Sequence, residues 1–261
     1  MHRIVWWLIV LLGLVLLAFI VYHAVGPPEQ RVVVRSRLPA EEPAGEPEIR
    51  HPVPPSPGEK PLPDLQASDA AMKDSLAELL GDSTLIEHAV LKDFVRHVVA
   101  TIDNLPRHTA APRIWPLKPA PGQFKVTGKD DHFTIAADNS KRYAIYVRLA
   151  ESIDSTKLVA FYFHYYPLFQ QAYRDLGYPK GYFNDRLIEV IDHLLETPEL
   201  EGPVTLVRPK VFYLYADPGL ESRSAGQKIL MRTGVENTRR IKAKLREIRT
   251  EIVNRSKPSA R

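Results

Sequence analysis

Residues 156–176, TKLVAFYFHYYPLFQQAYRDL, form the most aromatic stretch of the chain. Its aromatic residues fall on more than one helical face: they are Phe161, Tyr162, Phe163, Tyr165, Tyr166, Phe169 and Tyr173. A helix that is apolar on several faces is typical of the centre of a core. Pro167 removes a backbone donor and crowds the preceding turn, so it either kinks this helix or begins a new one. Aromatic platforms, here with His164, also stack sugars or bases, but the helical spacing favours core packing.

Helical periodicity on both sides of this stretch indicates a mainly α-helical fold. It predicts six more helices, over 69–80, 85–104, 139–149, 184–196, 224–233 and 236–253. Alternating apolar residues at 124–126 and 133–135 flank a Gly-Lys-Asp-Asp turn and predict one small β-hairpin, while 204–215 is predicted to be extended. We expect a single domain over 64–255 with about seven helices and one hairpin, followed by a disordered basic tail at 256–261.

The first 25 residues predict a single transmembrane anchor. Ile4–Tyr22 contains 19 residues without a charge, and at about 1.5 Å per residue such a helix spans roughly 28 Å, close to a hydrocarbon core. Trp6 and Trp7 at one end suit a membrane interface. A cleaved signal peptide is the alternative, but its apolar region would be too long, and cleavage after Ala24 would put Tyr22 where a small residue is favoured.

A proline-rich tether is predicted at 26–63, where 11 of 38 residues are proline. Each proline fixes φ and lacks a backbone donor, which favours an extended, partly polyproline-II chain. Basic residues lie on both sides of the span, and large domains translocate largely regardless of charge. We expect a single-pass protein of the bacterial inner membrane with its domain in the periplasm; a cytoplasmic domain is the alternative.

The composition excludes several chemistries. The chain has no Cys, which rules out disulfides, thiolate nucleophiles, iron–sulfur clusters and cysteine zinc sites. Its net charge of +4, from 35 basic and 31 acidic residues, is unevenly distributed. Residues 235–261 hold nine basic and three acidic residues, whereas 64–234 carries a net charge of −2. The protein is therefore a nearly neutral body with a basic C-terminal segment.

The first candidate site is a run of polar residues around one predicted helix. Asp185, Glu189 and Asp192 fall at i, i+4 and i+7, so their carboxylates line one side. The other candidates for contacting a polar ligand are Tyr178, Tyr182, Asn184, Arg186 and His193. Such spacing also suits acid/base or metal chemistry. Because no HExxH motif or second nearby His is present, we favour a helix cap formed by Asn184 or Asp185 and a solvated, ion-paired face, and we predict no metal or cofactor.

The second candidate is an anion site formed by four residues, Arg208, Lys210, Gln227 and Lys228. Backbone N–H groups and Lys228 at a helix start can hold an anion. Ser224 at the same start is also suited to a simple N-cap. The GxSxG and SxxK patterns of serine hydrolases are absent around it.

The predicted C-terminal helix carries a narrow apolar stripe formed by Ile241, Leu245, Ile248 and Ile252. Its other faces are basic, through Arg239, Arg240, Lys242, Lys244, Arg246 and Arg249. The favoured interpretation is a helix docked by its stripe with a solvated basic surface. Anionic lipid, an acidic polymer or an acidic protein are alternative ligands of that surface. Nucleic acid is the least favoured partner, because no nucleic-acid-binding fingerprint is present.

Seven segments resemble a family of uncharacterised bacterial proteins, the domain-of-unknown-function family 3014. They are VATIDNLP at 99–106, YPLFQQAY at 166–173, LGY at 176–178, YFNDRL at 182–187, VIDHLL at 190–195, RPK at 208–210 and SAGQK at 224–228. The resemblance covers about residues 68–252. It implies that the domain ends near Val253, that the span and tether belong to its layout, and that the periplasmic orientation is favoured. It implies no catalytic residue, because no activity is established for the family.

Three functions fit these features. The leading hypothesis is a membrane-anchored, non-catalytic scaffold domain that binds a protein or polymer partner in the cell envelope, because anchor, tether and domain come without a catalytic signature. One alternative is an enzyme acting on an envelope glycan or peptide through Asp185, Glu189 and Asp192. The other is a cytoplasm-facing module whose basic C-terminal helix binds anionic membrane or nucleic acid.

Overall fold

The computed structural model describes residues 48–54, 61–81, 86–129 and 132–257. The predicted membrane span, most of the predicted tether and residues 258–261 lie outside these ranges. Among the described residues, no helix combines the length and the apolar character needed to cross a membrane.

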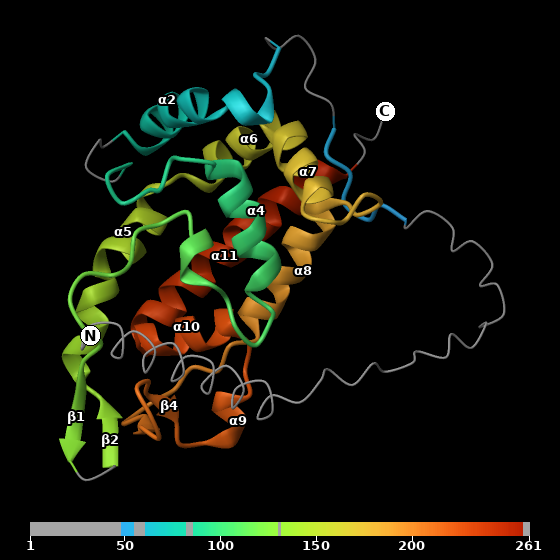
Figure 1. The fold of residues 1–261 in the computed structure, drawn as a ribbon. Coiled ribbons are helices and arrows are strands. Elements are labelled where there is room, and N and C mark those ends of the chain that lie inside the picture. Colours follow the sequence, from blue (N-terminus) through green and yellow to red (C-terminus); the bar gives the residue numbers. More distant parts are fainter. Residues whose placement is uncertain (1–47, 55–60, 82–85, 130–131, 258–261) are drawn as a thin grey trace, which may run out of the picture. The chain divides into compact units, whose positions relative to one another are not determined.

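The fold is mainly α-helical, as predicted, and the described residues form nine α-helices and one small antiparallel sheet (Figure 1). The α-helices are α2 (Asp69–Leu80), α4 (Phe94–Asn104), α5 (Ala144–Ser152), α6 (Ser155–His164), α7 (Tyr166–Asp175), α8 (Phe183–Leu195), α9 (Pro218–Glu221), α10 (Ala225–Thr233) and α11 (Val235–Ser256). The strands are β1 (Val126–Lys129), β2 (His132–Ile135), β3 (Thr205–Val207) and β4 (Leu214–Tyr215). Short 3-10 helices are η1 (Leu65–Ala67), η2 (Pro112–Ile114) and η3 (Ala137–Tyr143).

The aromatic stretch forms two helices, α6 and α7. The helix is interrupted at Tyr165, which lies between α6 and α7, and Pro167 lies in the first turn of α7. This proline therefore begins a new helix, since the first turn is where its missing N–H costs least. The expected number of seven helices is too low for two reasons. The aromatic stretch forms two helices instead of one, and the four-residue helix α9 was not predicted.

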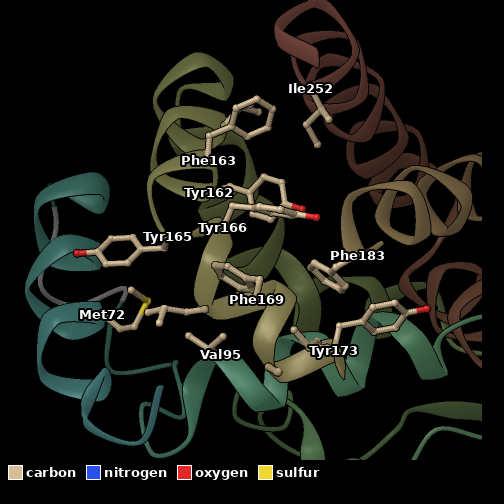
Figure 2. Packing of buried hydrophobic residues seen from close by; sticks show 14 of the residues in the cluster. Met72, Val95, Tyr162, Phe163, Tyr165, Tyr166, Phe169, Tyr173, Phe183 and Ile252 are labelled. Carbon is tan, nitrogen blue, oxygen red and sulfur yellow. The ribbon is translucent and has the colours of Figure 1, made fainter. Parts of the chain in front are cut away.

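The rings of α6 and α7 lie at the centre of the core. Tyr162 contacts Phe169 and Phe183 edge-on, with ring centroids 5.4 and 6.4 Å apart. Figure 2 shows these rings gathered between Met72 of α2 and Ile252 of α11. Each such pair contributes about 0.5–1.5 kcal/mol beyond its buried area. Core packing, rather than an exposed stacking platform, is thus the role of these residues.

α4 begins nine residues later than predicted, at Phe94. Asp93 has a positive φ of 51°, which interrupts helical geometry before α4. The carboxylate of Asp69 accepts hydrogen bonds from the backbone N–H groups of Asp93 and Phe94, at 2.8 and 3.2 Å. Upstream, the N–H of Val90 donates to the carbonyl of Pro116 at 2.8 Å. Long-range contacts therefore override the helical pattern of this segment.

The predicted hairpin is confirmed as β1 and β2, which pair antiparallel. β3 pairs with β2, and β4 pairs with β3, so the strand order is β1-β2-β3-β4. The prediction of a single hairpin therefore underestimates the sheet, which has four strands in the described part of the chain. The pattern of 204–215 indicates extended chain but does not identify its partner strand.

α11 packs along α5, α6 and α8. Its predicted apolar stripe faces them: Ile252 is buried, and Leu245 and Ile248 pack against the same core. Ile241 packs against a second cluster that contains Leu230 of α10. α11 thereby supports α8, the helix that carries the candidate site.

Candidate functional site

Two polar residues in the first turn of α8, Asn184 and Asp185, form the centre of the candidate site. α8 begins at Phe183, so Tyr182 occupies the N-cap position and makes no side-chain cap bond. The expectation that Asn184 or Asp185 caps this helix is wrong, because both side chains are buried and bound elsewhere. The Asp185 carboxylate nevertheless lies where the helix dipole favours negative charge.

A buried polar network beneath the helix start positions Asn184. The Tyr162 hydroxyl donates to Asn184 Oδ1 at 3.1 Å. The Tyr166 hydroxyl donates to Gln170 Oε1 at 2.8 Å, and that oxygen also accepts from the backbone N–H of Phe183 at 2.9 Å. Burial raises the pKa of Tyr162 and of Tyr166 well above the ordinary value, so both stay neutral donors. Because the amide oxygen of Asn184 is fixed, its Nδ2 is left to bind outside the network.

Residues 48–54 occupy the site and appear as the short blue trace beside α8 in Figure 1. The Asp185 carboxylate accepts the backbone N–H groups of Arg50 and His51, at 3.0 and 2.8 Å. These residues belong to the proline-rich stretch predicted as tether, 135 and 134 positions before Asp185. One carboxylate thus holds two consecutive peptide groups by charge-assisted bonds.

The next residues of this segment are held in the same manner. Asn184 Nδ2 donates to the carbonyl of His51 at 2.8 Å. The Tyr182 hydroxyl accepts the backbone N–H of Val53 at 2.7 Å, and the Val53 side chain packs against the core. Pro52, which has no N–H, lies between the two bonded residues. The helix start therefore recognises mainly backbone, together with one apolar side chain.

Glu189 adds a charge to the site. Its carboxylate pairs with the Arg50 guanidinium at 2.5 Å and with Arg186 at 3.5 Å. The Arg50 and Glu189 side chains are 56% and 47% exposed, and exposed pairs contribute about 0–1 kcal/mol. Glu189 therefore supplies a preference for a basic residue rather than most of the binding strength.

Asp103 on α4 is a site residue that the sequence analysis missed. It is 1% exposed, and its carboxylate pairs with Arg186 at 3.1 Å and with Arg107 at 2.6 Å. The Tyr178 hydroxyl also donates to it, at 3.2 Å. The hydrogen bond between Arg107 and Asp103, together with the negative charge of Asp103, raises the pKa of Arg107. The Tyr178 hydroxyl therefore contacts residues of α4 and of the segment that follows it. The sequence contains a signal that could have identified Asp103: it lies four residues after Val99, so its carboxylate falls on the apolar face of α4.

The third carboxylate of α8, Asp192, has a different partner. It forms a bidentate pair with Arg249 of α11, whose second bond is 3.0 Å long. The three carboxylates of α8 thus have different partners. Asp185 binds the backbone of the docked segment, Glu189 binds the Arg50 side chain of that segment, and Asp192 binds Arg249 of α11. No cluster of three His, Cys, Asp or Glu residues suited to a metal ion occurs in the described part of the chain.

His193 pairs with Ser224 at the start of α10. The distance from His193 Nε2 to Ser224 Oγ is 2.8 Å. The prediction that Ser224 is an N-cap is confirmed: its Oγ accepts the backbone N–H of Gln227 at 3.2 Å. Gln227 Nε2 in turn donates to the His193 carbonyl at 3.0 Å. These bonds join α8 to α10.

Three of the four candidates for an anion site contact different partners. Gln227 contacts His193. Lys228 pairs with Glu221 at 3.0 Å and donates to its carbonyl at 3.1 Å. Arg208 and Lys210 lie on the exposed loop between β3 and β4. The Arg208 guanidinium lies over the ring of Tyr213, 5.2 Å from its centroid.

Carboxylates neutralise most of the basic side chains of α11. Five of the six candidates are ion-paired: Arg239 with Glu199, Glu201 and Glu236, Arg240 with Glu151, Lys242 with Glu199, Lys244 with Glu247, and Arg249 with Asp192. The Lys242 and Lys244 side chains are only 8% and 9% exposed. Hydrogen bonds from Lys242 and Arg239 lower the pKa of Glu199. Arg246 lines an open hollow beside residues 151–156.

One of the comparisons with known proteins identifies a family. A family model described as Protein of unknown function (DUF3014) matches residues 94–249, which run from the start of α4 into α11 and include all of α8. No curated protein and no solved structure shows a significant match. Since the family model covers more than half of the chain, the protein belongs to the family of unknown function DUF3014.

Proposed function

We propose that this chain is a non-catalytic binding and scaffold protein of the bacterial cell envelope, whose domain holds an irregular polypeptide segment at the start of α8. The observation that carries the proposal is the docking of residues 48–54, where Tyr182, Asn184 and Asp185 make four hydrogen bonds to backbone groups. The chain's own segment would be the resident ligand of a site that also accepts a partner.

The contacts define the chemistry of such a ligand. Backbone N–H groups are needed at the positions of Arg50, His51 and Val53, and none is needed at Pro52. Glu189 favours a basic side chain at the first of these positions. The proposed ligand is therefore a segment of the form basic-x-Pro-apolar, with main-chain bonds giving affinity and Glu189 giving preference.

Binding fits the three carboxylates better than acid/base catalysis. A general acid or base must reach the proton that it transfers on a substrate. Asp185 is instead bound to two peptide N–H groups, while Glu189 and Asp192 are paired with arginines. The ion pairs of α11 likewise leave few free charges for the alternative in which that helix binds anionic membrane or nucleic acid.

The envelope location in this proposal comes from the sequence. The uncharged stretch at 4–22 favours an anchor, and the proline-rich stretch after it favours a spacer that lets the domain reach partners away from the bilayer. A topology reporter fused to the C-terminus tests this location. Activity only outside the cytoplasm is expected, and activity only inside would contradict the envelope role.

A peptide titration tests the binding site itself. A fluorescent peptide with the sequence of residues 48–54 is added to the full chain in detergent, and to a variant with Arg50→Gly, His51→Ser, Pro52→Gly and Val53→Ser. The fluorescence anisotropy of the peptide should rise to saturation as the variant is added. The intact chain should bind the peptide more weakly, because its own segment already fills the site.

Two further variants complete the titration. Asp185→Asn in the segment-substituted chain should abolish peptide binding, while Asp175→Asn, at an exposed pair with Arg96 on α7, should leave it unchanged. A folded, segment-substituted chain that does not bind the peptide would refute the site as a binding site for polypeptide.

A further inference from the structure

The loop between β3 and β4 exposes two adjacent apolar side chains. Val211 is 70% exposed and Phe212 is 78% exposed, the highest values among the large apolar side chains in the described ranges. Single exposed apolar residues are common on soluble proteins. An exposed Val-Phe pair at the tip of a loop has a larger solvation cost and is typical of a surface that contacts another phase or molecule.

Two cations precede this pair, at Arg208 and Lys210. Both side chains are exposed, and neither forms an ion pair with another described residue. The Arg208 guanidinium instead stacks on the ring of Tyr213. In this respect the loop differs from α11, whose basic residues mostly face carboxylates. Among the described residues, both cations of the loop therefore lack an acidic partner, whereas five of the six basic candidates of α11 have one.

The sheet register gathers further charges at the same end. Phe133 lies opposite Leu206, so the ends of β1 and β2 near Lys129 and His132 flank the β3–β4 loop.

We propose that the β3–β4 loop docks on an anionic lipid surface. Val211 and Phe212 enter the interface between headgroups and acyl chains, while Arg208 and Lys210 contact lipid phosphates. Exposed apolar side chains beside long cationic ones are the combination that partitions into an anionic membrane interface. The proposal is independent of the peptide site on α8, and it assigns a membrane contact to the domain itself.

The absence of native Cys allows a single label on the full chain. Val211→Cys carries an environment-sensitive fluorophore, and the chain is reconstituted with vesicles of phosphatidylcholine alone or with phosphatidylglycerol added. Lipids with a nitroxide on the acyl chain quench only a label that enters the bilayer interface. The control label is placed at Gln171→Cys, an exposed position on α7.

Quenching at position 211 that depends on phosphatidylglycerol, with no quenching at position 171, is expected. Arg208→Gln with Lys210→Gln should weaken binding to these vesicles about tenfold, and Phe212→Ser should also weaken it. Absence of quenching, or equal quenching without phosphatidylglycerol, would overturn the proposal. A blue shift without lipid that grows with protein concentration would assign the loop to a second copy and would also overturn it.

Discussion

A 2.8 Å hydrogen bond joins the carboxylate of Asp185 to the backbone N–H of His51, across 134 positions of the chain. The same carboxylate holds Arg50, and Asn184 beside it holds the carbonyl of His51. A helix start that sequence reasoning treats as capping its own backbone is therefore engaged with a distant one. This exchange of partners is the basis of the binding site proposed for α8.

Asp185→Asn should lower the free energy of unfolding by about 1–3 kcal/mol, because two partly buried, charge-assisted bonds to backbone N–H groups are weakened. Denaturant unfolding monitored by circular dichroism measures the change. Asp192→Asn on the same helix is the matched control, since its pair with Arg249 is 45% and 38% exposed, and it should change stability by less than about 1 kcal/mol. Equal effects of the two substitutions would contradict the special role of Asp185.

Asp103→Asn should be the more damaging substitution. It leaves Arg186, only 26% exposed, without its carboxylate, and removing one partner from a buried pair costs about 3–5 kcal/mol, or somewhat less where water reaches one side. Asp175→Asn serves as the control, because the pair with Arg96 is 36% and 42% exposed. Thermal unfolding compares the two variants. If Asp103→Asn melts at the same temperature as the control, the Asp103 ion pair does not hold α4 to α8.

Ser224→Ala should cost about 0.5–2 kcal/mol through loss of the N-cap of α10, and it also removes the hydrogen bond to His193. Urea unfolding measures the loss. Ser222→Ala is the control. Ser222 directly follows α9, and its exposed hydroxyl donates to the carbonyl of Gly219. An unchanged midpoint for Ser224→Ala would show that the cap contributes no stability.

Acid should destabilise the contacts of α11 through Glu199. Its pKa is lowered from the ordinary 4.5 by hydrogen bonds from Lys242 and Arg239, so its stabilising contribution is full above about pH 4.5 and is lost as the pH falls through the lower folded value. Thermal unfolding between pH 7 and 3 should therefore show a steeper decline for wild type than for Glu199→Gln. Glu201→Gln, at a side chain 77% exposed, should follow the wild-type curve. Parallel curves for wild type and Glu199→Gln would contradict this linkage.

Local signals predicted much of the fold. α2 has the bounds that periodicity indicates, Ser224 caps α10, and Gly234 ends it. The hairpin was also predictable from alternation. These features depend on residues a few positions apart, where propensity and side-chain period act directly.

Other features depend on partners far away in sequence. The docking of Arg50 on Asp185 has no local pattern, because the stretch around Arg50 has neither helical nor strand periodicity. The ion pairs of α11 arise because Glu151 and Glu199 come from neighbouring segments that only the tertiary fold brings close. Sequence reasoning could therefore name the residues of α8 and α11 but not their partners.

Hydrogen exchange at the amides of Arg50, His51 and Val53 in the full chain tests the occupied site most directly. Docking on α8 predicts that all three amides exchange about tenfold or more slowly than in a free peptide, and that Asp185→Asn removes this protection at Arg50 and His51. An excess of the peptide corresponding to residues 48–54 should also release them by displacement. Exchange of all three amides at free-peptide rates in the wild-type chain would contradict the docking and the binding site that rests on it.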